Sequence, residues 1–176
     1  MAHPESPKLV QRDRRSRPHT DWVPHIDLAP MTATPIHFRP VESDADLLAC
    51  YPIVRQLRPH LASPEAFQQA VAEQRREGYR VLAAWQHDAP CGFAGYRFQH
   101  NLIHGRFLYV DDLVTTQDER SSGVGSALLG ALKTLAREAG CTRLTLDTGM
   151  DNALAQRFYF RNGLLARGLH FGFDLR

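Results

Sequence analysis

A glycine-rich stretch at residues 111–126 decides the fold of this chain, and it reads Asp111-Asp112-Leu113-Val114-Thr115-Thr116-Gln117-Asp118-Glu119-Arg120-Ser121-Ser122-Gly123-Val124-Gly125-Ser126. Its first part is an apolar, strand-like run, and its last part opens a long helical pattern. Glycines let backbone N–H groups approach a ligand closely, and the free N–H groups at a helix N-terminus favour an anion. The stretch therefore predicts a strand, a loop that binds a phosphate or pyrophosphate, and a helix.

Two other phosphate-binding motifs fit this loop poorly. A Walker loop requires a lysine after its second glycine, whereas a serine and an alanine follow Gly125. A Rossmann fingerprint has a third glycine where this chain has Leu128, and its loop turns directly out of the preceding strand. Asp147 stands about where a ribose-binding acid would lie, but several residues separate the strand from Gly123. The loop is therefore interpreted as a different kind of pyrophosphate site.

Regular patterns extend from this stretch in both directions. Helices are expected after Ser43-Asp44 and after Ser63-Pro64, and over 124–139 and 152–162. In the first helix Pro52 is expected to cause a kink or a break, and the residues expected to face the core are Leu47, Leu48, Tyr51, Val54 and Leu57. Strands are expected at 36–40, 79–85, 91–98, 106–115, 143–147 and 165–175. This order, β-α-α-β-β-β-α-β-α-β, predicts an α/β (α+β) fold with a mostly antiparallel mixed sheet.

The composition excludes several classes of protein. A chain of 176 residues supports one core, and its 43% hydrophobic and 23% charged residues are usual for soluble proteins. No apolar run approaches the ~20 residues of a membrane helix. A net charge of +2 gives little attraction for nucleic acid or anionic lipid. We therefore expect neither a membrane nor a nucleic-acid partner.

The cysteines and the first 33 residues complete this picture. Cys50, Cys91 and Cys141 lie far apart, without C-x-x-C or metal-ligand spacing, and are interpreted as reduced packing residues of a cytoplasmic protein without a metal. Residues 1–33 hold five of the eleven prolines and a basic run that four acidic residues balance, without hydrophobic periodicity. They are predicted to form a disordered leader, with Met31 as an alternative start, and residues 34–176 to form one domain.

Two motifs together resemble the GNAT superfamily of N-acetyltransferases. Arg120-x-x-Gly123-x-Gly125, after an apolar strand, is similar to the family's R/Q-x-x-G-x-G/A coenzyme A loop. Asn152-x-x-Ala155-x-x-Phe158-Tyr159, followed by Gly163-Leu164, resembles the family's N-x-x-A-x-x-[L/F]-Y-x-x-x-G-[F/L] helix. The resemblance covers about 36–176 and is strongest over 109–164. One departure is Ser121-Ser122, because the family often has glycine directly after the arginine.

The resemblance implies that residues 34–176 form an acetyl-CoA-dependent N-acetyltransferase domain, whose sheet splays between its fourth and fifth strands. In this family the pantetheine arm hydrogen-bonds to the exposed edge of the fourth strand like an added strand, and the pyrophosphate binds the N–H groups of the loop. The residues that the resemblance assigns to acetyl-CoA are Leu113, Val114, Thr115, Arg120, Ser121, Ser122, Gly123, Val124, Gly125, Ser126, Asn152, Ala155 and Phe158.

Acetyl transfer to an amine also needs an acid and a base. An ammonium with a pKa of about 10.4 cannot attack until it loses a proton, and the departing thiolate takes a proton up. The resemblance assigns the acid to Tyr159. The alternative role of Tyr159 is packing beside Phe158 and Phe160 on a short helix.

The candidate bases are two adjacent carboxylates in the fourth strand. Strand alternation predicts that Asp111 and Asp112 face opposite sides of the sheet. Asp111, expected on the face of Tyr109 and Leu113, is the preferred base, and Asp112 is expected to be a substrate-side or structural charge. The alternative is that these acids form ion pairs with nearby arginines, Arg97 or Arg106.

The acceptor side rests on weaker signals. Arg58 and His60 lie between the first two helices, where this family shapes its acceptor pocket, and His170 alternates with Phe171 in the last expected strand. We expect direct attack by a small-molecule or peptide amine in a ternary complex, with polyamine, amino acid, antibiotic and protein amines all open. A non-catalytic acyl-CoA sensor and a basic-tailed nucleic-acid module are the alternative functions. The oligomeric state stays open, with a homodimer as one option.

Overall fold

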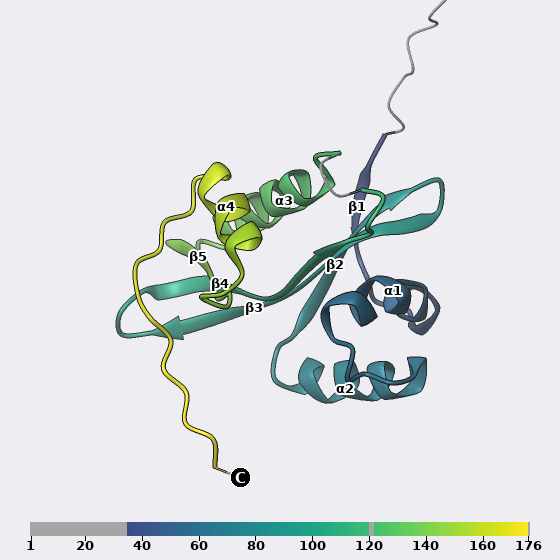
Figure 1. Cartoon of the computed structure of the whole chain (residues 1–176), viewed down its shortest axis with the longest axis horizontal. Helices are drawn as coiled ribbons and strands as arrows, with labels where there is room; N and C mark the ends of the chain where they lie inside the picture. The colour runs from purple at the N-terminus through teal and green to yellow at the C-terminus, as the bar shows by residue number, and fades with distance from the viewer. Residues whose placement is uncertain (1–34, 120–121, 176) are drawn as a thin grey trace, which may run out of the picture. The chain divides into compact units, whose positions relative to one another are not determined.

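In the computed structural model, a five-stranded sheet lies at the centre of the residues that the structure describes, 35–119 and 122–175 (Figure 1). In sheet order, the strands are β1 (His37–Pro40), β2 (Arg80–Gln86), β3 (Ala89–Asn101), β4 (Gly105–Thr115) and β5 (Arg143–Leu146). Neighbouring strands are antiparallel except β4 and β5, which are parallel and are joined by the helical crossover that parallel neighbours need. The predicted mostly antiparallel mixed sheet is confirmed.

Residues 1–34, 120–121 and 176 lie outside the described part of the chain. The expected leader at 1–33 and two residues of the expected acetyl-CoA loop, Arg120 and Ser121, therefore stay predictions. Among the helices of the described part, none has both the length and the apolar character that crossing a membrane requires.

The helices of the described part begin where the sequence places their caps. They are α1 (Asp44–Leu57), α2 (Pro64–Arg76), α3 (Val124–Glu138) and α4 (Ala153–Arg161). The hydroxyls of Ser43 and Ser63 each accept a hydrogen bond of 3.1 Å from a backbone N–H group in the first turn of α1 and α2. The side-chain oxygen of Asn152 does the same for α4, also at 3.1 Å. Each such cap contributes about 1 kcal/mol to the stability of its helix.

Apolar clusters hold the helices on opposite faces of the sheet (Figure 1). On one face, α1 and α2 pack against β2 and β3 through Leu47, Val54, Phe67, Val71, Ala83 and Phe93. On the other face, α3 packs against β2, β3 and β4 through Leu82, Ala94, Leu108, Val110, Leu128 and Leu132. The chain therefore has three layers, and the middle layer carries side chains toward both sets of helices.

Helix α1 differs from the prediction in two respects. Pro52 lies inside a continuous helix rather than dividing it. A proline removes one backbone hydrogen bond, but five buried side chains, Leu47, Cys50, Tyr51, Ile53 and Val54, hold the helix against the sheet on both sides of it. Leu48 and Leu57, which were expected to face the core, are each 37% exposed.

A β-bulge in β4 changes which way the two adjacent acids face. Asp112 pairs with Gly95, and Val110 pairs with Tyr96, so Asp111 is an extra residue without a partner across β3. The predicted alternation is therefore wrong here: Asp111 and Asp112 line the same cavity under α1 and α2. Asp111 lines this cavity together with Tyr109, as expected, whereas Leu113 packs with the α3 cluster and does not line it.

Strands β4 and β5 separate halfway along β4. Their ladder ends at the pair between Val110 and Leu146, whereas β4 continues to Thr115 along β3. Within the described residues, the edge of β4 at 111–115 therefore has no partner strand on the β5 side. The predicted splay between the fourth and fifth strands is confirmed, and it leaves backbone groups free to bind an extended ligand.

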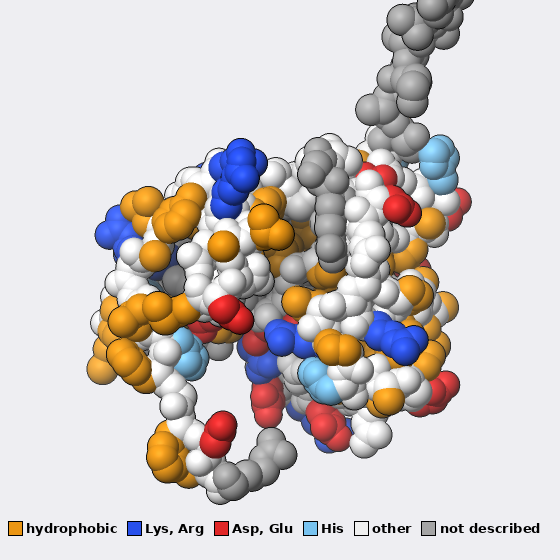
Figure 2. Space-filling model, in the orientation of Figure 1, with side chains coloured by type: hydrophobic (Ala, Val, Ile, Leu, Met, Phe, Trp, Pro, Cys, Tyr) orange, Lys and Arg blue, Asp and Glu red, His pale blue; other side chains and the backbone are white. Residues whose placement is uncertain are grey.

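The last predicted strand, 165–175, does not form. Within the described residues this segment pairs with no strand, and its alternating apolar side chains are exposed, Phe171 and Phe173 each at 86% (Figure 2). Alternation predicts which face a strand would bury, but a strand also needs a ladder, and Gly168 and Gly172 weaken its tendency to form one. The observed order is therefore β-α-α-β-β-β-α-β-α.

Candidate active site

Two cavities meet at β4, where it separates from β5. The first, here called the helix cavity, has a volume of about 430 Å³ and is lined by Val54, Arg58, His60, Leu61, Phe67, Ala70, Val71, Gln74, Tyr79, Tyr109, Asp111 and Asp112. The second, here called the splay cavity, has a volume of about 420 Å³ and is lined by Leu57, Arg58, Tyr109, Val110, Asp111, Leu113, Leu146, Asp147, Thr148, Gly149, Asn152, Ala155 and Tyr159. The two cavities share Arg58, Tyr109 and Asp111. Ligands in the two cavities would therefore be neighbours.

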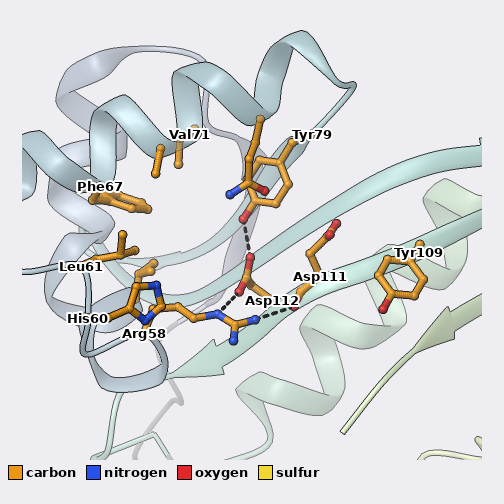
Figure 3. Close-up of a pocket in the computed structure, with 12 residues that line it drawn as sticks. Arg58, His60, Leu61, Phe67, Val71, Tyr79, Tyr109, Asp111 and Asp112 are labelled. Atoms are coloured by element: carbon orange, nitrogen blue, oxygen red, sulfur yellow. Dashed lines mark hydrogen bonds and ion pairs between the residues drawn. The ribbon is translucent and has the colours of Figure 1, made fainter. Parts of the chain in front are cut away.

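Asp112 is held by two partners in the helix cavity (Figure 3). The Nε group of Arg58 donates to one carboxylate oxygen at 2.8 Å, and the hydroxyl of Tyr79 donates to the other at 2.7 Å. Burial, and then the charge of Asp112, raise the pKa of Tyr79, so its hydroxyl stays protonated and keeps donating. Each oxygen of the Asp112 carboxylate thus accepts a hydrogen bond from a neighbouring side chain.

Gly95 makes the bond between Tyr79 and Asp112 possible. It pairs with Asp112 across the sheet, and the Tyr79 ring occupies the space where a side chain at position 95 would project. A Cβ atom there would overlap the phenol ring, so any larger residue would displace Tyr79 from its partner. Position 95 therefore requires glycine because the Tyr79 ring lies so close to the backbone there.

Asp111 has one direct cationic partner and faces both cavities. The Nε group of Arg97 lies 3.2 Å from each of its carboxylate oxygens. Burial raises the pKa of Asp111 above its ordinary value, although Arg97 acts in the opposite direction. A carboxylate with a raised pKa is a better proton acceptor than an ordinary one, and this one retains 21% side-chain exposure.

Arg97 is itself fixed in place by two further contacts. It donates to the side-chain oxygen of Gln74 at 2.7 Å and to the exposed carboxylate of Glu77 at 3.1 Å. The ion pair between Asp111 and Arg97, which was the alternative interpretation of this acid, is therefore present. Asp111 nevertheless lines both cavities, so the ion pair does not remove it from their walls.

The three residues that line both cavities form a shared wall, and one of them, Tyr109, contacts the residue that follows β5. Its hydroxyl donates to Asp147 at 2.6 Å, and the same carboxylate oxygen lies 2.9 Å from Nδ1 of His170. Burial, followed by the hydrogen bond to Asp147, raises the pKa of Tyr109 strongly. Tyr109 is therefore a protonated donor.

Tyr159 lines the splay cavity from α4. Burial raises the pKa of Tyr159, so the phenol is protonated at neutral pH. Its ring contacts Phe158 edge-on, with centroids 5.4 Å apart. Within the described residues its hydroxyl has no hydrogen-bond partner, which leaves that proton available to a ligand in the cavity.

The glycine loop forms the N-terminus of α3 next to the splay. Gly123 caps the helix with φ of +96°, a conformation that favours glycine, and the Ser122 hydroxyl accepts a long hydrogen bond of 3.5 Å from the N–H group of Val124. The first N–H groups of α3 have no partner within the helix. Gly125 lies against the Phe158 ring and Thr115, so the loop, the end of β4 and α4 converge.

The predicted site residues divide into three groups. Those that line a cavity are Arg58, His60, Leu113, Asn152, Ala155, Tyr159, Asp111 and Asp112. Others belong to the converging segments around the splay but do not line it, and they are Val114, Thr115, Ser122, Gly123, Val124, Gly125, Ser126 and Phe158. His170 lines neither cavity and contacts Asp147 instead, and none of the three cysteines lines them either.

The structure also adds residues that the sequence did not single out as parts of the site. Tyr79, Gln74 and Arg97 position the two acids, and Tyr109 forms part of the shared wall. Arg97 was considered only as an alternative partner. Each of these residues reaches the site through strand pairing or helix packing, which a local pattern does not reveal.

Comparisons with known proteins agree with this arrangement. The acetyltransferase (GNAT) family model matches residues 45–164. The uncharacterized N-acetyltransferase YhdJ of Bacillus subtilis (strain 168) is 32% identical over 124 residues, which cover 70% of this chain and 87% of that protein.

Solved structures show the same fold at lower identity. The aminoglycoside N-acetyltransferase AAC(6')-Iy, in complex with CoA, is 17% identical with a TM-score of 0.71, and the alignment covers 82% of this chain and 97% of that one. The aminoglycoside acetyltransferase meta-AAC0020, from an uncultured soil metagenomic sample and in complex with sisomicin, is 14% identical with a TM-score of 0.65 over 80% and 97% of the two chains. The family match and the Bacillus subtilis relative together show that this chain belongs to the GNAT family of acetyltransferases.

Proposed function

We propose that this chain transfers the acetyl group of acetyl-CoA to an amine acceptor by direct attack, with both substrates bound at once. The observation that carries this proposal is that the helix cavity and the splay cavity share Arg58, Tyr109 and Asp111. An acceptor in the first cavity and a thioester in the second would meet at this shared wall. Bringing two reactants together in this way removes much of the entropic cost of a bimolecular step.

The splay cavity and the glycine loop are the proposed donor site. The free edge of β4 at 111–115 suits the amide groups of pantetheine, and the N-terminus of α3 suits the pyrophosphate. Ser122 to Ser126 would contribute backbone N–H groups, together with Arg120 and Ser121, while Asn152, Ala155 and Phe158 would flank the chain of the donor. The donor supplies an acetyl group already activated as a thioester.

Asp111 is the proposed base and Tyr159 the proposed acid. Asp111 borders both cavities, has a raised pKa, and would take the proton from the attacking ammonium directly or through a water molecule. Tyr159 is protonated and faces the splay cavity, so its hydroxyl would give a proton to the departing sulfur. Asp112, engaged by Arg58 and Tyr79, is proposed to shape the acceptor side as a fixed charge.

Thiol release from acetyl-CoA, measured over a panel of amines, tests this function. We expect release that depends on the amine, together with an amine product heavier by one acetyl group in mass spectrometry. Coenzyme A binding without amine-dependent release from any amine would instead identify a non-catalytic acyl-CoA sensor.

Acetyl-CoA is expected to stabilise the folded protein. A ligand that binds only the native state adds RT ln(1 + [L]/Kd) to the free energy of unfolding, about 2.7 kcal/mol at a hundredfold excess over Kd. For a domain of this size, the melting temperature should rise by about 5 to 10 °C. Thermal denaturation with millimolar acetyl-CoA measures this rise, and an equal concentration of acetate is the control. A folded protein that melts at the same temperature with and without acetyl-CoA contradicts the donor site.

Replacing Gly125 by valine is expected to weaken coenzyme A binding by at least about tenfold. A Cβ atom at this position would lie 3.4 Å from the Phe158 ring and 3.6 Å from Thr115, so one methyl group fits but a branched side chain does not. Gly125→Ala is therefore the matched control, with a smaller loss of affinity. Calorimetry on both folded variants checks this, and equal coenzyme A affinity in the valine variant and the parent would place the donor elsewhere.

A further inference from the structure

We infer that the acceptor is a monoamine, an amine with a single positive charge carried on an apolar body, rather than a polycation. This inference rests on the proposed function and specifies the acceptor for the same site. It separates this chain from the two structural neighbours that are named as aminoglycoside acetyltransferases, because aminoglycosides carry several ammonium groups.

The lining of the helix cavity holds two carboxylates, Asp111 and Asp112, and one guanidinium, that of Arg58, so its carboxylates exceed its guanidiniums by one. Its two carboxylates each have a guanidinium partner, Arg58 at 2.8 Å from Asp112 and Arg97 at 3.2 Å from Asp111. A polycation would need several surplus carboxylates to compensate its desolvation, because an unpaired buried charge is costly. The excess is a single carboxylate, because Arg97 does not line the cavity and is shared between Asp111 and Glu77, and a single carboxylate suits one ammonium group rather than several.

Each of these two guanidiniums makes further contacts besides its carboxylate partner. Arg97 is held at the same time by Gln74 and Glu77. Arg58 also donates to the backbone carbonyl of Asp111 at 3.1 Å. A ligand with several ammonium groups would therefore lie beside the positive charge of Arg58, which lines the cavity, and near that of Arg97, which contacts Asp111, and both charges oppose its binding.

The other nearby acids do not add a carboxylate to the lining of the helix cavity. Glu77 is 74% exposed and does not line the helix cavity. Asp147 lines the splay cavity and accepts the hydroxyl of Tyr109. Of the two, neither offers a free carboxylate to a second ammonium group inside the helix cavity.

The inner part of the helix cavity is apolar. Figure 3 shows Phe67, Leu61 and Val71 on one side of the hydrogen-bonded line from Arg58 through Asp112 to Tyr79, with Asp111 and Tyr109 on the other side. Ala70 adds to the apolar lining. An acceptor with its amine beside Asp111 would thus place its body against carbon atoms, where each buried methylene favours binding and a second ammonium does not.

A pair of amines of equal size tests this inference. Hexylamine and 1,5-diaminopentane have the same number of heavy atoms and differ by a methyl group in place of an ammonium. We expect kcat/KM for hexylamine to exceed that for the diamine by at least about tenfold, with kanamycin slower still. Equal or faster acetylation of the diamine or of kanamycin overturns the inference and leaves the proposed function in place. If none of the tested amines causes thiol release from acetyl-CoA, the proposed function itself is overturned, and the inference with it.

A variant that fills the apolar part gives an independent test. Ala70→Leu projects three more carbon atoms into the helix cavity from α2, whereas Ala66→Leu makes the same change at an exposed position of the same helix. We expect the ratio of kcat/KM for hexylamine over ethylamine to fall at least about tenfold in Ala70→Leu and to be unchanged in Ala66→Leu. Thermal melting with acetyl-CoA shows that both variants are folded and bind the donor. The same ratio in both folded variants would mean that the acceptor does not use this space, and the inference fails.

Discussion

Replacing Tyr159 by phenylalanine is expected to lower kcat and kcat/KM together by about 10²-fold to 10⁴-fold. The substitution keeps the ring, its edge-on contact with Phe158 and helix α4, and removes only a hydroxyl that borders the splay cavity. Because that hydroxyl has no hydrogen-bond partner within the described residues, its loss leaves no buried group unpaired. Stability and coenzyme A affinity should therefore survive.

The expected size of the effect follows from when the interaction is made. A ground-state thioester has little need of a proton on sulfur, whereas the departing thiolate does, so the hydroxyl acts mainly in the transition state. Losing it costs about 3 to 5 kcal/mol of transition-state stabilisation, which appears equally in kcat and kcat/KM. KM for acetyl-CoA should barely change, and steady-state kinetics with the best acceptor measure all three constants.

Tyr96→Phe is the matched control for this experiment. Tyr96 is buried among the side chains under α3 and lines neither cavity. Loss of the Tyr96 hydroxyl should leave turnover within about twofold of the parent, since the Tyr96 side chain packs in the α3 cluster and borders neither cavity. If Tyr159→Phe also keeps more than half of the parent's turnover, in a regime where chemistry limits the rate, Tyr159 is a packing residue and solvent protonates the thiolate.

The parts of the fold that depend on local patterns could be predicted from the sequence. The serine and asparagine caps, the apolar face of α3 and the glycine loop each involve residues within a few positions of one another. Cap chemistry and helical periodicity act over that distance, so the sequence alone indicates them.

The features that depend on pairing between distant segments could not be predicted in this way. At Asp111, the register between β3 and β4 shifts by one residue and forms the bulge. The alternation of side chains along a strand, taken from the sequence alone, does not reveal where such an extra residue lies. Gly95 looks like a weak strand residue until Tyr79 is seen to occupy its side-chain space. The segment 165–175 has the alternation of a strand but not a partner among the described residues.

Replacing Asp111 by asparagine is expected to lower kcat/KM by about 10²-fold to 10⁴-fold and to change its pH dependence. In the parent, Asp111 must be ionised before it can take the proton of the bound ammonium, whereas a variant without this base must wait for an amine that has already lost its proton to water. At low pH, log kcat/KM of the parent should therefore rise with a slope of about 1 and level off above the pKa of Asp111. Burial raises that pKa, so the break should lie above the ordinary range of an aspartic acid. In the variant the slope should stay at about 1.

The same raised pKa predicts how stability responds. An acid whose pKa is higher in the folded state contributes stability below its unfolded-state pKa and loses that contribution as pH rises through the folded-state value. At neutral pH the Asp111 carboxylate is therefore not stabilising on balance, because burial outweighs the effect of Arg97. Since Arg97 keeps its contacts to Gln74 and Glu77, Asp111→Asn should leave the melting temperature at pH 7 within about 2 °C of the parent.

Asp112→Asn separates catalysis from ion pairing. Asp112 bonds to Arg58 and Tyr79 and lines only the helix cavity, so its amide variant should weaken acceptor binding and stability while keeping the low-pH break. The two roles of Asp111 then give opposite results. If Asp111 is the base, Asp111→Asn loses activity and the break in the pH profile but keeps its stability. If Asp111 serves only the ion pair with Arg97, the variant loses stability and keeps the break. A variant Asp111→Asn that melts several degrees lower, yet retains the parent's pH profile, would assign Asp111 to the structural pair with Arg97 and leave the proton of the amine to water or another group.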